Sequence, residues 1–250
     1  MKLLTIITIF ALPLFLFSPG GTCEKIIGGR EVAPHSRPYM VYLSADCGGA
    51  LIKENWVLTA AHCHREKGMY AILGAHSING NEKEQQMIDV EEQVIHKHYN
   101  SLTQANDIML VKLSKKATIN QYVQTLQLPT RGVHPGAGTI CRIAGWGKTE
   151  YNGNPADALQ EVTVKVISKE ECNGRDSYNG KLTTSMMCAG ERYKGGKDVC
   201  QGDSGGPLIC GDTYTGIASF GVQCGQKNFP GVYTRLTDDY LDWIKTVTEY

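Results

Sequence analysis

The sequence lacks an excess of either charge, an internal repeat and a second long apolar run. Its 250 residues hold 25 Lys and Arg against 25 Asp and Glu, so the formal net charge is zero. This balance gives no sign of the basic surface that nucleic-acid or polybasic membrane binding needs, and we expect neither partner. Glycine is abundant, at 28 residues, which is typical of a turn-rich globular chain rather than a disordered one.

The one long apolar run lies near the N-terminus, at residues 3–17. It is shorter than the ~20 residues that cross a bilayer, Pro13 interrupts it, and small residues follow it. We therefore predict a secretory signal peptide over residues 1–23, with an uncleaved anchor as the alternative. The mature chain is then expected to fold in an oxidising compartment.

No CxxC pair is present, which argues against a zinc site, although His62-Cys63-His64 has ligand-like residue types. Of nine cysteines, cleavage after Cys23 would leave an even set, and that suits four disulfides. Spacing alone leaves on the order of 100 connectivities open. The remaining eight are Cys47, Cys63, Cys141, Cys172, Cys188, Cys200, Cys210 and Cys224.

Short β-type segments bounded by Gly, Asn, Asp or Pro recur along the chain, which indicates an all-β sandwich or barrel. Examples are the segments 39–43, 57–59, 108–113, 139–144, 162–167, 208–210, 216–220 and 231–236. A mature length of ~225 residues would make two barrels of roughly 110 each, joined near 128–138. A cleft between two barrels is a common place for a site.

Two helical signals stand apart from the strands. Ser168, followed by Glu171 three residues later, fits a capping box for a short helix. Residues 238–247 form the second signal, with an apolar stripe at helical spacing that we expect to pack on a barrel. The stripe consists of Tyr240, Leu241, Ile244 and Val247.

The segment GDSGG, at 202–206, matches G-x-S-x-G, a nucleophile motif of another hydrolase class. That class needs a histidine after its serine, and none follows Ser204. A subtilisin-like order needs an aspartate before the histidine, and the only one before His62 is Asp46, at an expected strand end. The chain order that remains is His, Asp, Ser.

His62 ends the apolar stretch WVLTAAHC, whereas the other six histidines lie in polar surroundings typical of the surface. Asp107 stands directly before an apolar run, so we expect a buried carboxylate that needs a partner such as an imidazole N–H. An imidazole can remove the proton of a serine hydroxyl, and the aspartate holds it in the right tautomer. The backbone N–H groups of Gly202 and Ser204 would bind the oxyanion that forms.

The motifs LTAAHC, NDIML and GDSGGP, in this order, resemble those of the trypsin/chymotrypsin family of serine endopeptidases, and the similarity runs from Ile26 to the end. The resemblance implies two six-stranded antiparallel β-barrels with a C-terminal helix, and one protease domain over 26–250 that needs no cofactor. It places catalytic His62, Asp107 and Ser204 in the cleft. It also implies four disulfides: Cys47–Cys63, Cys141–Cys210, Cys172–Cys188 and Cys200–Cys224.

The two aspartates upstream of Ser204 have separate roles in this family. Cleavage before IIGG frees the amine of Ile26, which would pair with Asp203, so the uncut chain is expected to be inactive. Asp198 matches the base of a pocket that binds the Lys or Arg side chain before the scissile bond.

Three further residues match the same substrate pocket. Gly221 and Gly231 match its open walls, and Ser219 matches a residue that supports the cleft. Val199 departs from the serine often found beside the pocket aspartate. Because valine offers no hydroxyl to a lysine ammonium, we predict a preference for Arg over Lys.

CEKIIGGREVAPHSRPYM, LGAHSI and ASFG more closely resemble the granzyme A/K group of lymphocyte granule proteases. The dipeptide 24–25 then resembles a pro-dipeptide removed by a dipeptidyl peptidase, with secretion or granule storage as the expected localisation and cytolysis as the expected role. The stretch HKHYNSLTQAND lacks the cysteine of the covalent granzyme A dimer, so we expect no disulfide-linked dimer.

Protease inhibitors and proteoglycan are further partners that the resemblance leads us to expect. Losing residues 1–25 leaves 23 basic and 24 acidic residues, which weakens the case for tight proteoglycan binding. Calcium-binding trypsins carry a glutamate where this chain has Ala75, so no metal site is expected. No N-x-S/T sequon occurs, and we expect no N-glycosylation.

Two alternative functions remain open. The first is a secreted digestive or extracellular trypsin-like protease with the same chemistry. The second is a non-catalytic binding protein on the same fold, which is disfavoured because all three residues expected to be catalytic are present.

Overall fold

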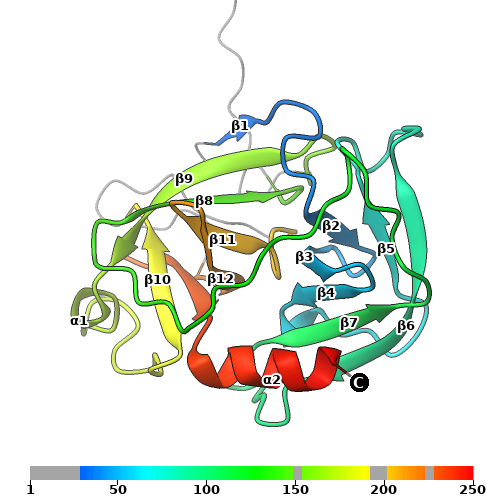
Figure 1. The fold of residues 1–250 in the computed structure, drawn as a ribbon. Helices are drawn as coiled ribbons and strands as arrows, with labels where there is room; N and C mark the ends of the chain where they lie inside the picture. Colours follow the sequence, from blue (N-terminus) through cyan, green and yellow to red (C-terminus); the bar gives the residue numbers. More distant parts are fainter. Residues whose placement is uncertain (1–28, 149–153, 192–201, 223–227, 250) are drawn as a thin grey trace, which may run out of the picture.

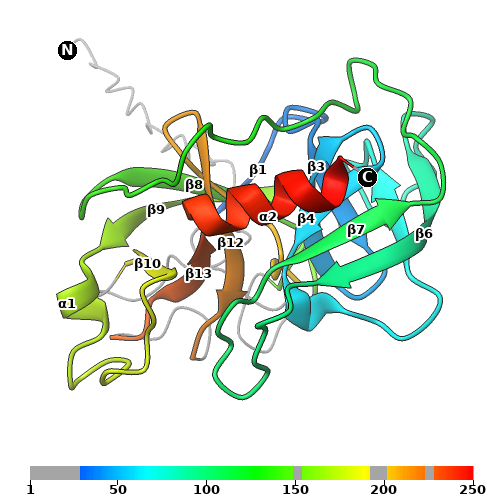
Figure 2. The same ribbon diagram turned by 60° about the horizontal axis from the view of Figure 1, so that its bottom comes forward.

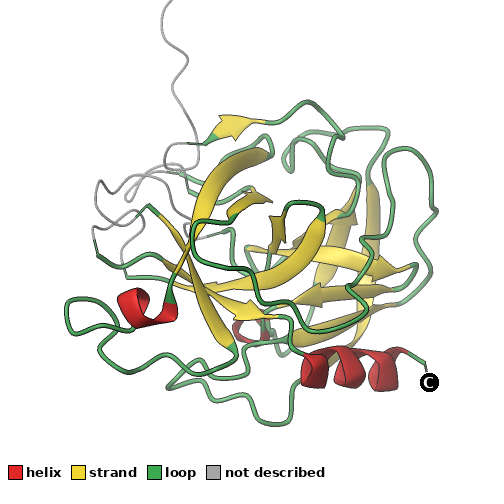
Figure 3. Ribbon diagram, turned by 60° about the vertical axis from the view of Figure 1, so that its left-hand side comes forward, coloured by secondary structure: helices red, strands yellow, loops and turns green. Residues whose placement is uncertain are grey.

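The computed structural model describes residues 29–148, 154–191, 202–222 and 228–249. Two closed six-stranded antiparallel β-barrels dominate it (Figure 1). Strands and loops make up most of the chain, with few helical turns (Figure 3). Among the described residues, no helix has the length and apolarity to cross a bilayer.

The first barrel comes from the N-terminal half of the chain. In spatial order it contains β2 (Met40–Leu43), β3 (Cys47–Lys53), β4 (Trp56–Thr59), β7 (Met109–Leu113), β6 (Gln86–Ile95) and β5 (Tyr70–Leu73). Leu51, Leu58 and Leu110, from β3, β4 and β7, are fully buried in one hydrophobic core. Because the barrel closes on itself, it leaves no unpaired strand edge.

The second barrel comes from the C-terminal half. In spatial order it contains β8 (Ile140–Gly145), β9 (Gln160–Ile167), β10 (Met186–Gly190), β13 (Gly231–Arg235), β12 (Thr213–Phe220) and β11 (Pro207–Cys210). The pairing of β8 with β9 closes this ring, and the short β1 (Arg30–Glu31) adds to β9 outside it. The predicted fold of two six-stranded barrels is therefore confirmed.

The chain passes from the first barrel to the second between β7 and β8. Within this connection, the Leu126 N–H donates to the Leu51 oxygen of the first barrel. The Val133 N–H then donates to the Leu236 oxygen beside β13 of the second barrel. The crossing therefore lies between Leu126 and Val133, and the join near 128–138 stays a prediction.

All eight predicted β segments lie in strands whose ends fall within three residues of the expected ones. The segments named from the sequence do not include β1, β3, β5, β6 and β10. Strand β3 begins with Cys47-Gly48-Gly49, and glycine rarely indicates a strand. A side chain at Gly49 would collide with Val57 of β4, so close strand packing requires this glycine.

Three disulfides join described residues: Cys47–Cys63, Cys141–Cys210 and Cys172–Cys188. They are three of the four pairs that the resemblance implies. The fourth, Cys200–Cys224, lies outside the described residues. In the second barrel the Cys141–Cys210 bridge joins directly paired residues of β8 and β11, and so crosslinks neighbouring strands.

Two helices follow the sequence signals. Helix α1 (Lys169–Cys172) begins after Ser168, whose hydroxyl accepts a hydrogen bond from the Glu171 N–H at 3.1 Å. Helix α2 (Asp238–Thr248) begins after Thr237, which caps the Tyr240 N–H at 3.3 Å. The caps satisfy N–H groups that have no partner inside a helix.

Helix α2 follows the last strand of the second barrel but packs on the first (Figure 2). Its buried apolar side chains are Tyr240 and Ile244, with Trp243 and Val247 half-buried and packed on the same core. Leu241, the remaining residue of the predicted stripe, is half-buried and lies outside this core cluster, whereas the larger Trp243 ring packs on it.

Shortening the packed face of α2 should destabilise the fold. Ile244→Ala is expected to lower the free energy of unfolding by about 2–4 kcal/mol, because it removes buried methyl groups and leaves a cavity. The matched control is Lys245→Ala at the exposed neighbouring position, expected to stay within about 0.5 kcal/mol. Urea unfolding of a Ser204→Ala background avoids self-digestion, and equal midpoints for both variants would contradict this packing.

Candidate active site

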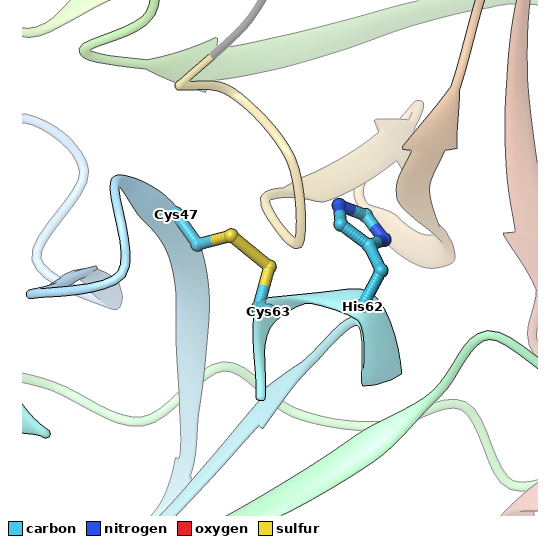
Figure 4. A group of neighbouring side chains, drawn as sticks. All are labelled: Cys47, His62 and Cys63. Atoms are coloured by element: carbon cyan, nitrogen blue, oxygen red, sulfur yellow. A yellow bond between two sulfur atoms is a disulfide. The ribbon is translucent and has the colours of Figure 1, made fainter. Parts of the chain in front are cut away.

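His62 lies in η1 (Ala61–Cys63), a short 3₁₀ turn directly after β4. The Cys47–Cys63 disulfide ties this turn to the start of β3 (Figure 4). The two sulfurs and a His62 nitrogen lie within 4.8 Å of one another, a spacing that would suit a metal. Because the sulfurs are bonded to each other, they offer no thiolate, and the disulfide instead fixes the backbone that carries the imidazole.

Asp107 is the fully buried partner of His62. Its Oδ2 lies 2.7 Å from His62 Nδ1, and its Oδ1 accepts the main-chain N–H of His62 at 2.9 Å. Ser219, from β12 of the second barrel, donates its hydroxyl to Oδ2 at 2.5 Å. A carboxylate can only accept hydrogen bonds, so Nδ1 carries a hydrogen and the other ring nitrogen, Nε2, has its lone pair available in the neutral ring.

The residue before Asp107 sets the direction of this carboxylate. Asn106 adopts a left-handed conformation (φ 56), which asparagine tolerates better than most residues. Its side chain accepts the Tyr240 hydroxyl at 2.8 Å and donates to the His98 oxygen at 2.8 Å. Helix α2 thus supports the turn that points Asp107 at His62.

Tyr99 lies in the same loop and stays neutral. Burial and the charge of Asp107 both raise the pKa of its phenol above the usual value. Its hydroxyl donates to Gln104 at 3.2 Å within the loop. The loop that leads into Asp107 is therefore held by its own side chains as well as by α2.

Ser204 lies in the connection that leads into β11 of the second barrel, and this connection contacts the first barrel. The main-chain oxygen of Ser204 accepts a hydrogen bond from the Gly48 N–H of β3 at 2.7 Å. A side chain at Gly205 would collide with Thr59, and its Cβ would lie 3.2 Å from the Ala60 nitrogen. Thr59 and Ala60 lead directly into η1. Figure 4 shows the gold segment, which leads into β11, passing beside His62.

The glycines around Ser204 lie where other backbone segments come very close. Gly202 and Gly205 have φ of +102 and +80, a region that residues with a Cβ rarely adopt. The N–H of Gly205 donates to Ala218 and that of Gly206 to Asp203, which fixes the segment after the serine. The assignment of the oxyanion hole to Gly202 and Ser204 stays a prediction.

Asp203 is fully buried beside Ser204 but belongs to a different network from Asp107. Its Oδ1 accepts the Gly147 N–H at 2.9 Å. A Cβ at either Gly145 or Gly147 would overlap its carboxylate, so both glycines make room for it. Its predicted partner, Ile26, lies outside the described residues.

The predicted substrate pocket is described only in part. Asp198 and Val199 lie outside the described residues. Gly221 and Gly231 lie close together, because a Cβ at Gly221 would stand 3.9 Å from the Cα of Gly231. Their role as pocket walls stays a prediction. Ser219 has a more specific place than expected, because it contacts the Asp107 carboxylate itself.

The loop matched to the calcium site of trypsins is closed by its own side chains. Ala75 is buried and has no ligand oxygen on its side chain. The Glu82 carboxylate accepts the N–H groups of His76 and Ser77 at 2.7 and 3.0 Å. Gln85 donates its amide to the Ser77 oxygen at 2.7 Å. Internal hydrogen bonds thus hold this loop, and the absence of a metal site here stays a prediction.

A model of the trypsin family matches residues 26–244. Trypsin I-P1 of Gallus gallus is 44% identical over 227 residues, which cover 89% of each chain. Granzyme A of Bos taurus is 44% identical over 229 residues, covering 90% of this chain and 88% of its own. Serine protease 1 of Homo sapiens is 43% identical over 234 residues, covering 92% of each.

The two barrels and these matches define a serine endopeptidase, a hydrolase of peptide bonds. The chain belongs to the trypsin family.

Proposed function

We propose that the chain cleaves peptide bonds after Arg, and less efficiently after Lys, with Ser204 as nucleophile, His62 as general base and Asp107 as its orienting partner. The observation that supports this most is the hydrogen-bond network of His62, Asp107 and Ser219 beside the segment that carries Ser204. Family membership supplies the reaction class, and the network supports His62 and Asp107 as two of the groups that would perform it.

In the proposed mechanism, Nε2 of His62 takes the Ser204 hydroxyl proton as Oγ attacks the substrate carbonyl carbon. The resulting oxyanion accepts hydrogen bonds from the N–H groups of Gly202 and Ser204. The imidazolium, stabilised by Asp107, then gives its proton to the leaving amine as the C–N bond breaks, which leaves an acyl-enzyme. Water, deprotonated by His62, hydrolyses that ester and restores the serine.

Reporter substrates test the proposed function directly. A chain beginning at Ile26 is expected to hydrolyse peptide reporters with Arg or Lys before the scissile bond, and not those with Phe or Asp, because Asp198 would bind only a cationic side chain. Ser204→Ala serves as the control for contaminating proteases. Hydrolysis of the Phe reporter at the rate of the Arg reporter would contradict the proposed pocket.

Among basic residues we expect Arg to be preferred by about fivefold or more in kcat/KM. Guanidinium pairs with a carboxylate through two hydrogen bonds, whereas an ammonium gains more from a neighbouring hydroxyl that Val199 lacks. Val199→Ser should therefore raise kcat/KM for the Lys reporter while leaving the Arg reporter nearly unchanged. Equal use of paired Arg and Lys reporters by the wild-type chain would overturn this preference.

We further propose that the chain is made as an inactive precursor with a signal peptide at 1–23 and an activation dipeptide at 24–25. The place of Asp203 supports this, because its fully buried carboxylate directly precedes Ser204, where the new amine at Ile26 is expected to bind. A dipeptidyl peptidase would perform the cleavage, and granule storage or secretion would follow. The chain that retains 24–25 should therefore show almost no activity until that peptidase is added.

The granule role is favoured by the 24–25 dipeptide and the motifs around it. The identity to Trypsin I-P1 equals that to Granzyme A, and a digestive trypsin is the alternative. Activation of the precursor by a dipeptidyl peptidase supports the granule reading, whereas activation only by an endopeptidase supports the alternative.

A further inference from the structure

Thr234 contacts the backbone of Asp107 from the other barrel. It lies in β13 of the second barrel, whereas Asp107 precedes β7 of the first. Its Oγ1 donates a hydrogen bond to the main-chain oxygen of Asp107 at 2.9 Å. Both residues are buried, with 2% and 0% of their surface exposed. A buried hydrogen bond thus joins the two barrels at the residue that orients His62.

Asp107 needs this bond because of its position in the chain. It follows the left-handed Asn106, and the Ile108 N–H turns back to the Asn106 oxygen. The Asp107 carbonyl therefore lies outside the strand ladder, and within the part of the chain that the structure describes no backbone N–H donates to it. A buried carbonyl without a donor is unfavourable, so the Thr234 hydroxyl satisfies a requirement of this turn.

Thr234 and Ser219 hold opposite ends of the same residue. Ser219 lies in β12, the strand paired with β13, and its hydroxyl bonds to the carboxylate, while Thr234 bonds to the backbone. With both ends fixed by adjacent strands, the carboxylate cannot turn away from His62 without breaking a buried hydrogen bond. We propose that Thr234 is a positioning residue, which keeps Asp107 aligned with His62 through its backbone; this inference rests on the proposed function.

The test compares threonine-to-valine variants at two buried sites. Thr234→Val removes the hydroxyl and keeps the branched shape. Its matched control is Thr215→Val in β12, which is fully buried and donates only to the Thr213 oxygen of its own hairpin. In the chain beginning at Ile26, Thr234→Val should lower kcat for an Arg reporter by about 10- to 100-fold, because a small displacement of the base is costly.

Three readouts separate positioning from a general loss of structure. Active-site titration normalises each rate to the intact enzyme, and KM should change by less than about twofold, since the pocket is untouched. Thr234→Ser, which restores the hydroxyl, should recover most of kcat. The NMR signal of the His62 Nδ1 proton should move in Thr234→Val and stay in place in Thr215→Val.

Each outcome decides the proposal. If Thr234→Val matches Thr215→Val in kcat and in the Nδ1 signal, Thr234 has no positioning role. If Thr234→Val does not fold, Thr234→Ala also removes the hydroxyl and allows the same comparison of kcat and of the Nδ1 signal. Failure of the proposed function would look different: the wild-type chain would then show no activity that Ser204→Ala abolishes.

Discussion

Ser204→Ala is expected to lower kcat of the chain beginning at Ile26 by about 10⁵- to 10⁶-fold on an Arg reporter. Without the hydroxyl no acyl-enzyme forms, and only substrate binding and the oxyanion hole remain. Burst and steady-state kinetics with an Arg ester measure this loss, and the burst should vanish. KM is expected to change little, because the substrate pocket is separate from the nucleophile.

The matched control is Ser101→Ala, at an exposed loop position whose side chain takes no part in the site. It should leave kcat unchanged. If Ser204→Ala retained more than about one per cent of the activity after purification to constant specific activity, another nucleophile would have to be sought.

Asp107→Asn is expected to lower kcat by about 10⁴-fold, the magnitude measured for this change in well-studied serine proteases. The carboxylate accepts hydrogen bonds on both oxygens, from the His62 backbone, the His62 ring and Ser219. An asparagine side chain has one oxygen and one NH₂ group, so one of these donors would face another donor. If the NH₂ faces Nδ1, the ring must carry its hydrogen on Nε2, which cannot then accept the serine proton.

The control for this substitution is Asp89→Asn, which makes the same change of charge at an exposed position of β6. It should leave kcat within about twofold. A crystal structure of Asp107→Asn should show an undisplaced His62 ring. The substitution is expected to lower kcat by changing the tautomer of the ring and not by unfolding the chain. Wild-type activity in Asp107→Asn would mean that the buried carboxylate has only a structural role.

The fold was predictable where apolar β-type residues stand together between turn residues. The segment at 108–113 is such a case, and it forms β7. Strand β6 was missed because charged residues such as Glu91 and Glu92 interrupt the apolar pattern on its solvent-facing part. Closure of the barrels depends on pairings between distant strands, which local patterns do not encode and which the family resemblance supplied.

The site was predictable where chemistry and local context coincide. His62 and Asp107 each adjoin an apolar run, and the structure brings them to 2.7 Å. Thr234 and Tyr240 gave no local signal, because each contacts the site across more than a hundred residues of sequence, 127 and 134 respectively. A threonine in a strand and a tyrosine on a helix face are ordinary core residues until the packing of one barrel on the other places their hydroxyls.

Covalent labelling can show whether His62 activates Ser204 beside an Arg-binding pocket. The chain beginning at Ile26 would be treated with a phosphonate inhibitor carrying a guanidinium group, and the modified residue located by peptide mass spectrometry. We expect one adduct per chain, on Ser204, which is lost in His62→Ala and prevented by an excess of an Arg substrate. An adduct on another residue, or one formed equally well without the imidazole, would contradict it.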